Sequence, residues 1–173
     1  MEEESVRILG VDPGTARLGW AFLEDRLGIV ALLDFGCLET ASTTQSAPRL
    51  QTLFHGLRDL MARYQPQEMA VEKLFFSKNV KTALAVGEAR GVILLAAAEA
   101  GLRIAEYTPG QVKESVTGTG SAEKGQVQRM VQRLLHLEEL PSQDDAADAL
   151  AIALCHAQVR KMERAVALAE ART

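Results

Sequence analysis

The sequence predicts an α/β protein in which helices flank a mixed five-stranded sheet. Short apolar runs alternate with longer segments whose apolar residues recur every three or four positions. The first strand-like runs follow one another directly, as in an antiparallel meander, whereas the later ones are separated by helices, as in parallel pairs. The chain has 173 residues, 47% of them hydrophobic, which fits one domain over residues 1–173.

The first part of the chain predicts three antiparallel strands and a helix. Residues 6–12 (VRILGVD) form a short apolar run typical of a buried strand. Residues 18–26 and 29–40 predict two more strands, with Gly28 near the reversal between them. A helix follows, because apolar residues then recur at helical spacing: Leu50, Leu53, Phe54, Leu57, Leu60, Met61 and Tyr64. Pro66 ends it.

The second part predicts two parallel strands and four helices. In chain order these are a strand over 68–72, a helix from the Asn79 cap to about Ala100, a strand over 103–107, a short helix beginning at Thr108 and Pro109, a helix from the Ser121 cap to about His136, and a last helix from Pro141 and Ser142 to about Ala169. The strands over 6–12, 68–72 and 103–107 should be parallel, since helices connect them.

Acidic residues end two strands that we expect to be neighbours. Asp12 ends the strand over 6–12, and Glu72 ends the strand over 68–72. Ligands and catalytic groups gather beyond the carboxyl ends of parallel strands, so both carboxylates are expected in one crevice. Each also has a structural explanation: Asp12 begins the favoured turn sequence Asp-Pro-Gly, and Glu72 alone is compatible with the start of a surface loop.

The last predicted helix carries three further acids in the segment SQDDAADALAIAL. Asp145 and Asp148 are three residues apart and share a helix face, and Asp144 lies near that face. Asp148 stands among alanine and leucine, which is unusual on a solvated face. The alternative is that Ser142 and Asp145 form a capping box, because acids also favour helix N-termini.

Together these acids predict a site for hard cations. Three or four carboxylates without histidine or cysteine suit Mg²⁺ or Mn²⁺ better than Zn²⁺. Two such ions can activate water and stabilise the leaving oxygen in phosphodiester cleavage. The residues themselves therefore predict a divalent-cation site, and phosphodiester cleavage is one reaction that such a site can perform.

Charge and cysteine content narrow the class of protein further. The net charge is −4, but residues 1–72 carry −5, residues 73–133 carry +4 and residues 134–173 carry −3. The basic middle is compatible with a phosphate-binding surface or with ordinary surface charge. Cys37 and Cys155 are expected to be free buried thiols. The acidic N-terminus and the lack of a long apolar run predict a cytoplasmic protein without a membrane span.

Four long stretches carry a resemblance over nearly the whole chain: ILGVDPGTARLGW, AVEKLFFSKNVKTALAVGEARGV, EYTPGQVKESVTGTGSAEKGQVQRMV and DAADALAIA. They resemble the RuvC family of bacterial Holliday junction resolvases, which have the ribonuclease H-like fold. The resemblance implies a homodimeric endonuclease with two Mg²⁺ ions per active site, Mn²⁺ being a substitute. It implies paired symmetric nicks in four-way DNA junctions during recombination and repair, with the branch-migration proteins RuvA and RuvB as partners.

The resemblance also assigns roles to individual residues. The implied metal-binding carboxylates and basic catalytic residues are Asp12, Glu72, Asp145, Asp148, Lys113 and Lys124. The family's D-A-A-D spacing favours Asp145 over Asp144, although some members have histidine at that place. For each lysine alone, a solvated surface position is the structural alternative.

Further residues are expected to contact DNA. Phe75 matches the family's aromatic residue that meets an unstacked base near the cut, and core packing is the alternative. Lys78, Lys81 and Arg90 are weaker candidates for contacts along the DNA backbone.

A row of small residues predicts how two copies associate. Ala83, Gly87 and Gly91 are spaced four apart on one predicted helix, which lets a second helix approach closely. The alternative is that this row packs on the protein's own sheet.

Three other functions compete with junction cleavage. The segment from Asp12 to Gly19 also resembles the phosphate loop of actin-like ATPases, which are much longer chains. The related YqgF-type nucleases of ribosomal RNA processing and a junction-binding protein without catalysis are the others. ATP turnover without DNA would support the ATPase. Junction binding without cleavage would support the binding protein.

Overall fold

The computed structural model describes residues 5–73 and 80–171, with only the backbone of 80–82. Its five strands form one sheet in the order β3-β2-β1-β4-β5. The strands are β1 (Ser5–Asp12), β2 (Arg17–Arg26), β3 (Ile29–Glu39), β4 (Glu68–Glu72) and β5 (Arg103–Tyr107). β1, β2 and β3 pair antiparallel, whereas β1, β4 and β5 pair parallel, which confirms the predicted mixed sheet.

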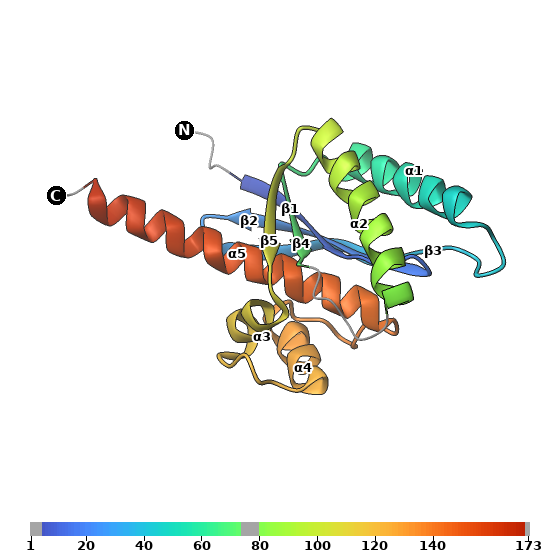
Figure 1. Ribbon diagram of the computed structural model, residues 1–173. Helices are drawn as coiled ribbons and strands as arrows, with labels where there is room; N and C mark the ends of the chain where they lie inside the picture. The colour runs from blue at the N-terminus through green and yellow to red at the C-terminus, as the bar shows by residue number, and fades with distance from the viewer. Residues whose placement is uncertain (1–4, 74–79, 172–173) are drawn as a thin grey trace.

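Helices cover both faces of this sheet (Figure 1). They are α1 (Ser46–Tyr64), α2 (Val80–Glu99), α3 (Pro109–Thr117), α4 (Lys124–Leu134) and α5 (Asp144–Glu170). α1 and α2 pack together on one face, and α5 crosses the other face and extends beyond it. α3 and α4 pack against the first part of α5.

The alternation of side chains along the strands explains why acids reach the α5 face. On β1, Leu9 and Val11 enter the core beneath α1 and α2, whereas Ile8 enters the core beneath α5. Because side chains alternate between faces, Asp12 shares the α5 face with Ile8. On β4, Ala70 lies in the α5 core, so Glu68 and Glu72 also face α5.

The structure corrects two predicted helix starts. α4 begins at Lys124, and its N-cap Glu123 makes no side-chain cap bond, so the predicted Ser121 cap is wrong. Ser121 instead bonds Thr119 within the preceding loop. α5 likewise begins at Asp144 rather than Ser142, and the capping box with Asp145 is not formed.

Other predicted boundaries agree with the structure or lie outside its described part. Thr108 caps α3 and forms a capping box with Gln111. The predicted Asn79 cap falls among the residues that are not described. Cys37 and Cys155 are free, as predicted, but only Cys155 is buried, and Cys37 is partly exposed. Within the described residues, no helix is long and apolar enough to cross a membrane.

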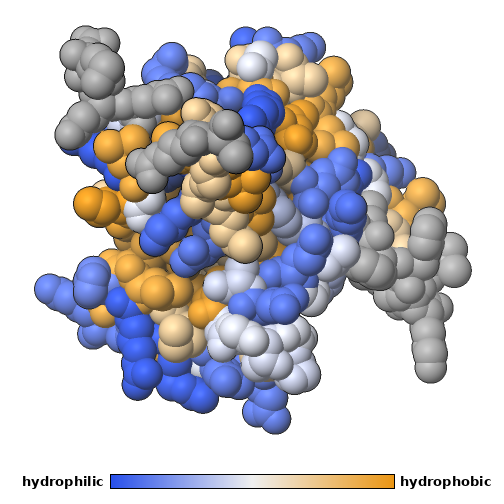
Figure 2. All heavy atoms as spheres, turned by 90° about the vertical axis from the view of Figure 1, so that its left-hand side faces the viewer, coloured by the Kyte–Doolittle hydropathy of each residue, from blue (hydrophilic) through white to orange (hydrophobic). Residues whose placement is uncertain are grey.

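Figure 2 looks onto the end of the molecule where α5 leaves the sheet. Hydrophobic and hydrophilic side chains are mixed on this face. Met162, Val166 and Leu168, in the C-terminal part of α5, are more than half exposed.

Candidate active site

A cleft of about 250 Å³ opens beyond the carboxyl ends of β1 and β4. Its lining includes five of the six predicted catalytic residues: Asp12, Glu72, Asp148, Lys113 and Lys124. They come from two strands and three helices, and α3, α4 and α5 supply the apolar remainder of the wall. The structure therefore brings together residues that are up to 136 positions apart in the sequence.

Asp12 is the most perturbed acid of this cleft. Its pKa is raised from 3.8 to about 8. Burial is the largest cause, and the negative charges of Asp148, Glu72 and Asp145 add to it. Lys124 acts in the opposite direction but does not offset the other causes. Asp12 therefore lies where an additional positive charge would stabilise its ionised form.

Glu72 and Asp148 show the same behaviour. Burial raises the pKa of Glu72, the charge of Asp148 raises it further, and Lys113 lowers it. Burial also raises the pKa of Asp148, although Lys124 donates a hydrogen bond of 3.1 Å to it. The acids thus repel one another across the cleft.

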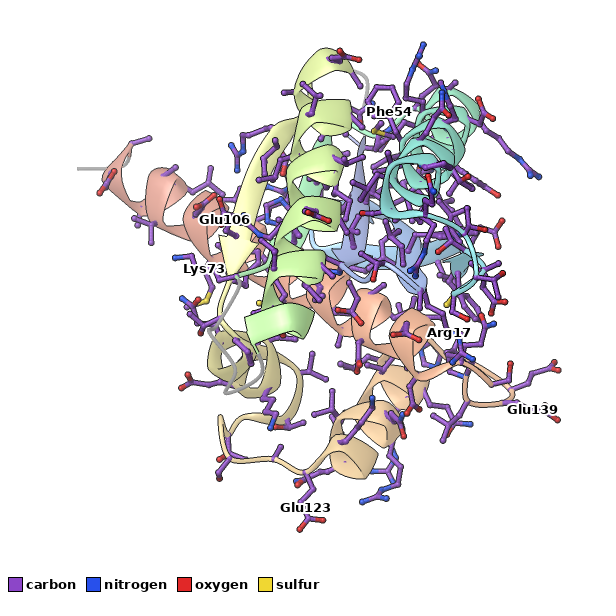
Figure 3. The ribbon with its side chains drawn as sticks, turned by 45° about the vertical axis from the view of Figure 1, so that its right-hand side comes forward. Arg17, Phe54, Lys73, Glu106, Glu123 and Glu139 are labelled. Carbon is purple, nitrogen blue, oxygen red and sulfur yellow. The ribbon has the colours of Figure 1, made fainter. Side chains whose placement is uncertain are left out.

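Asp145 lies at the edge of this group, on the first turn of α5. Its carboxylate is 4.0 Å from a guanidinium nitrogen of Arg17, which also lies 3.6 Å from Glu39. In Figure 3, Arg17 lies near the start of α5, and Lys73 and Glu106 lie on the opposite side of the view. Gln143, just before the helix, donates a bond of 2.8 Å to Glu39. The start of α5 is thus tied to the end of β3.

Arg17 was not among the predicted site residues. The β1–β2 register supplies the missing signal, because Arg17 is two positions before Gly19, and Gly19 pairs with Asp12. Side chains two apart on a strand share a face. A basic residue at that spacing is therefore expected near Asp12.

Asp144 and Asp145 have different surroundings. Asp144 is exposed, and its pKa is lowered chiefly by a hydrogen bond from Lys124, with a further bond from Gln128. Asp144 is thus paired with Lys124 and Gln128, whereas Asp145 lies 4.0 Å from Arg17 and contributes to the raised pKa of Asp12. This difference agrees with the family spacing, which favours Asp145.

The donor set of the cleft fits a hard divalent cation. All of its acidic groups are carboxylates, and three of them have raised pKa values because they are buried close together. In the described part of the chain, no group of three or more Asp, Glu, His or Cys side chains already has an arrangement that could hold a metal ion. An ion at Asp148 would compete with Lys124, which is hydrogen-bonded there.

The predicted DNA-contacting residues divide into two groups. Phe75 and Lys78 lie outside the described residues, and of Lys81 only the helical backbone is described. The Arg90 side chain is largely buried, forms an ion pair with Glu106, and donates a bond of 3.4 Å to the carbonyl oxygen of Glu72. Arg90 therefore supports the end of β4, next to the cleft.

A larger hollow of about 310 Å³ lies between the ends of α1 and α2. Glu99 is the single carboxylate in its described lining, beside Arg58 and mostly apolar residues. The hollow has no cluster of acids and lies away from Asp12, so the smaller cleft is the candidate site.

Comparisons with known proteins agree on one family. The family model described as crossover junction endodeoxyribonuclease RuvC matches residues 8–156. A protein of that name from Moorella thermoacetica is 56% identical over 163 residues, which is 92% of this chain and 98% of the relative. A protein of the same name from Roseiflexus is 48% identical and covers 94% and 96%, respectively.

Solved structures show the same likeness. The Thermus thermophilus RuvC structure in complex with a Holliday junction substrate matches with a TM-score of 0.85 and 35% identity, over 91% of this chain and 96% of that chain. The yeast mitochondrial Holliday junction resolvase has a TM-score of 0.61 at 13% identity, over 91% and 82%, and shows the shared fold alone. The chain belongs to the RuvC family.

Proposed function

We propose that this protein is a metal-dependent endonuclease that resolves four-way DNA junctions by paired symmetric nicks in recombination and repair. The observation that carries the proposal is the cleft in which buried acids with raised pKa values face two lysines. The Thermus thermophilus relative, solved with a junction substrate, supports the substrate class.

Asp12, Glu72, Asp145 and Asp148 would hold the ions, which we infer to be two Mg²⁺ ions per site, with Mn²⁺ as a substitute. Bound ions supply an activated water and stabilise the leaving oxygen. The position of each acid is set by the end of a strand or by the first two turns of α5. Asp144, which is paired with Lys124 and Gln128, is not assigned as a ligand.

The lysines and the apolar wall of the cleft have complementary roles. Lys113 and Lys124 would contact the phosphate of the cut strand and stabilise charge that develops during cleavage. Val112 of α3 and Val127 of α4 form part of an apolar wall of the cleft, and such a wall would limit the access of water to the acids. Phe75, Lys78 and Lys81 remain predicted DNA contacts.

A synthetic four-way junction tests this function directly, with linear duplex of the same sequence beside it. We expect cleavage of the junction in Mg²⁺ or Mn²⁺ and little cleavage of the duplex. Asp12→Asn should abolish cutting and keep junction binding, measured by gel shift in EDTA. Asp59→Asn, which changes an exposed acid on α1, is the matched control and should cut normally.

The outcomes separate the competing functions. Normal cutting by Asp12→Asn would show that the site is wrongly assigned. Tight junction binding by the wild-type protein without cleavage in either metal would indicate a binding module. Metal-dependent cleavage of structured RNA but not of the junction would favour the YqgF-type function, and ATP turnover without DNA would favour an ATPase.

We also infer that two copies associate through α2. Ala89, Ile93 and Ala97 of this helix are buried, whereas Leu84 and Leu95 on the other side are more than half exposed. Gly91 lies between these leucines at helical spacing, and a Cβ built there meets no atom of the described chain within 4 Å. Two exposed leucines with a small residue between them suit a second helix.

Gly91→Glu tests the homodimer, because the protomer has room for the new side chain while an apolar interface does not. We expect a folded monomer by analytical ultracentrifugation, beside a dimeric wild type. Gln51→Glu on the exposed face of α1 is the control and should remain dimeric. A monomeric wild type would contradict the dimer, and a dimeric Gly91→Glu would place the interface elsewhere.

Two further assignments rest on family membership alone. We infer that the protein works with the branch-migration proteins RuvA and RuvB. A cytoplasmic location goes with a function on bacterial chromosomal DNA.

A further inference from the structure

Gly19 lies opposite Asp12 in the ladder between β1 and β2. Directly opposed residues of an antiparallel pair project to the same face of a sheet. That face is the one covered by α5, whose buried residues pack on Ala21 and Ile8. A side chain at position 19 would therefore stand beside the Asp12 carboxylate, beneath the start of α5.

The first turn of α5 lies directly on Gly19. A Cβ at this position would be 1.9 Å from the carbonyl oxygen of Asp145, 2.4 Å from its carbonyl carbon and 3.1 Å from the nitrogen of Ala146. All three are backbone atoms, so no side-chain rotation would relieve the overlap. The helix itself would have to move away from the sheet.

Gly10 of β1 is a second position at which α5 lies directly on the backbone of a strand. A Cβ there would be 2.4 Å from the carbonyl oxygen of Ala149 and 2.7 Å from the Cβ of Ala153. Asp145, Ala149 and Ala153 are spaced four apart and so form one line along the helix. α5 thus rests on the sheet through its backbone and two alanines, over two glycines in neighbouring strands.

These glycines are not needed for an unusual backbone conformation. The described glycines with positive φ are Gly28, Gly101 and Gly118, and neither Gly10 nor Gly19 is among them. Any L-residue could adopt their extended conformation. What glycine provides here is space for the helix.

We propose that Gly19 is a positioning residue of the active site, because its missing side chain sets how closely the start of α5 approaches Asp12, with Asp145 in its first turn and Asp148 in the next. The inference rests on the proposed function, since it concerns the same acids. An added methyl group would shift this turn by about 1 Å or more, and a displacement of that size can reduce a rate by about a hundredfold.

Gly19→Ala is the direct test, with Gly110→Ala as the matched control. Gly110 lies in the first turn of α3, and a Cβ there meets Thr108 Oγ1 at an ordinary 3.9 Å. Three quantities are measured at a temperature where each variant is folded by circular dichroism. They are Mn²⁺ affinity by calorimetry, junction binding in EDTA, and the cleavage rate at saturating Mn²⁺.

For Gly19→Ala we expect Mn²⁺ affinity to fall by about tenfold and the cleavage rate by about a hundredfold. Junction binding in EDTA should change by less than about twofold, because the phosphate contacts of the lysines do not depend on the spacing of the acids. Gly110→Ala should match the wild type in all three measurements.

A purely structural role gives a different result. If Gly19→Ala is less heat-stable but, while folded, binds Mn²⁺ and cuts as the wild type does, the inference is wrong. If Gly19→Ala does not fold, Gly10→Ala is measured in the same way: weaker Mn²⁺ binding by the folded protein supports the inference, and unchanged binding overturns it. Failure of the wild type to cut a junction would instead contradict the proposed function.

Discussion

Glu68 and Glu72 lie at the two ends of the five-residue strand β4, and both face α5, yet their pKa values are shifted in opposite directions. Burial acts to raise the pKa of Glu68, but hydrogen bonds from His156 and Arg160 outweigh it, and the pKa is lowered. At Glu72, burial and the charge of Asp148 together raise the pKa.

The surroundings of Glu68 form a closed network in the core. His156 lies 2.5 Å from Glu68 through Nε2 and 2.6 Å from the Tyr107 hydroxyl through Nδ1. Burial lowers the pKa of His156, so we infer a neutral ring that accepts from Tyr107 and donates to Glu68. Arg160 completes the network by pairing with both Glu68 and Asp25.

The comparison separates an acid whose charge is stabilised by its neighbours from acids whose charges are destabilised by burial and by one another. The charge of Glu68 is compensated within the protein, as stable burial of an ion requires. The acids around Glu72 instead destabilise one another, which a fold without function has no reason to retain. The sign of the pKa shift therefore distinguishes two glutamates that are four residues apart on one strand.

The largest effect should follow from Glu72→Gln. Loss of a carboxylate that we assign to metal binding should lower junction cleavage by on the order of a thousandfold or more. Because the folded protein disfavours the Glu72 charge, the same variant should be at least as heat-stable as the wild type in EDTA. Cleavage assays and thermal melts check both; a marked loss of stability would contradict the comparison.

Glu68→Gln should show the reverse pattern. Removing one member of a buried ion network leaves Arg160 with Asp25 and takes the charged acceptor from His156, which costs about 3 kcal/mol of folding free energy. Urea denaturation measures this loss. Cleavage, assayed while the variant is folded, should stay within a few-fold of the wild type, and a loss as large as that of Glu72→Gln would remove the distinction.

The pH dependence of stability should reflect both kinds of acid. The folded protein holds a proton on Asp12 up to pH about 8, whereas the unfolded chain releases it near 3.8, so stability in EDTA falls as pH rises between these values. The lowered pKa of Glu68 acts oppositely and removes stability as pH falls through its titration. Urea denaturation at several pH values between 3.8 and about 8 should show a shallower decline in stability for Asp12→Asn; an equal decline would contradict the assignment.

The smallest effect should come from Arg103→Gln. Arg103 lies 3.7 Å from Glu68, but its side chain is 61% exposed. Exposed ion pairs contribute about 0.5 kcal/mol or less, so the free energy of unfolding should change by no more than that. A loss close to that of Glu68→Gln would mean that the network extends to the surface.

Much of the fold could be predicted because the information is local. Apolar runs gave the strands, and the connecting helices gave the parallel pairs. Asp12 and Glu72 were recognisable because strand ends and neighbouring strands follow from topology. The predicted caps at Ser121 and Ser142 were wrong, because a serine before a helix can bond to groups other than the helix N-terminus. The Ser121 hydroxyl, for example, bonds to Thr119 in its own loop.

The network around Glu68 could not be predicted in the same way. Its members come from β2, β4, β5 and α5, and Asp25 and Arg160 are 135 positions apart. The pattern EMAVE places Glu68 and Glu72 on one face, but only the packed helix decides which glutamate meets His156. The role of Gly19 could not be predicted either, because it depends on the backbone of Asp145 lying against it.

The length of α5 has a consequence for how this protein can vary among lineages. The helix continues to Glu170, whereas the match to the family ends at residue 156 and every side chain from 165 to 171 is exposed. Arg164 still reaches the sheet through its ion pair with Asp25. We expect a chain that is shortened or altered after Arg164 to keep the acids at the other end of the helix in place.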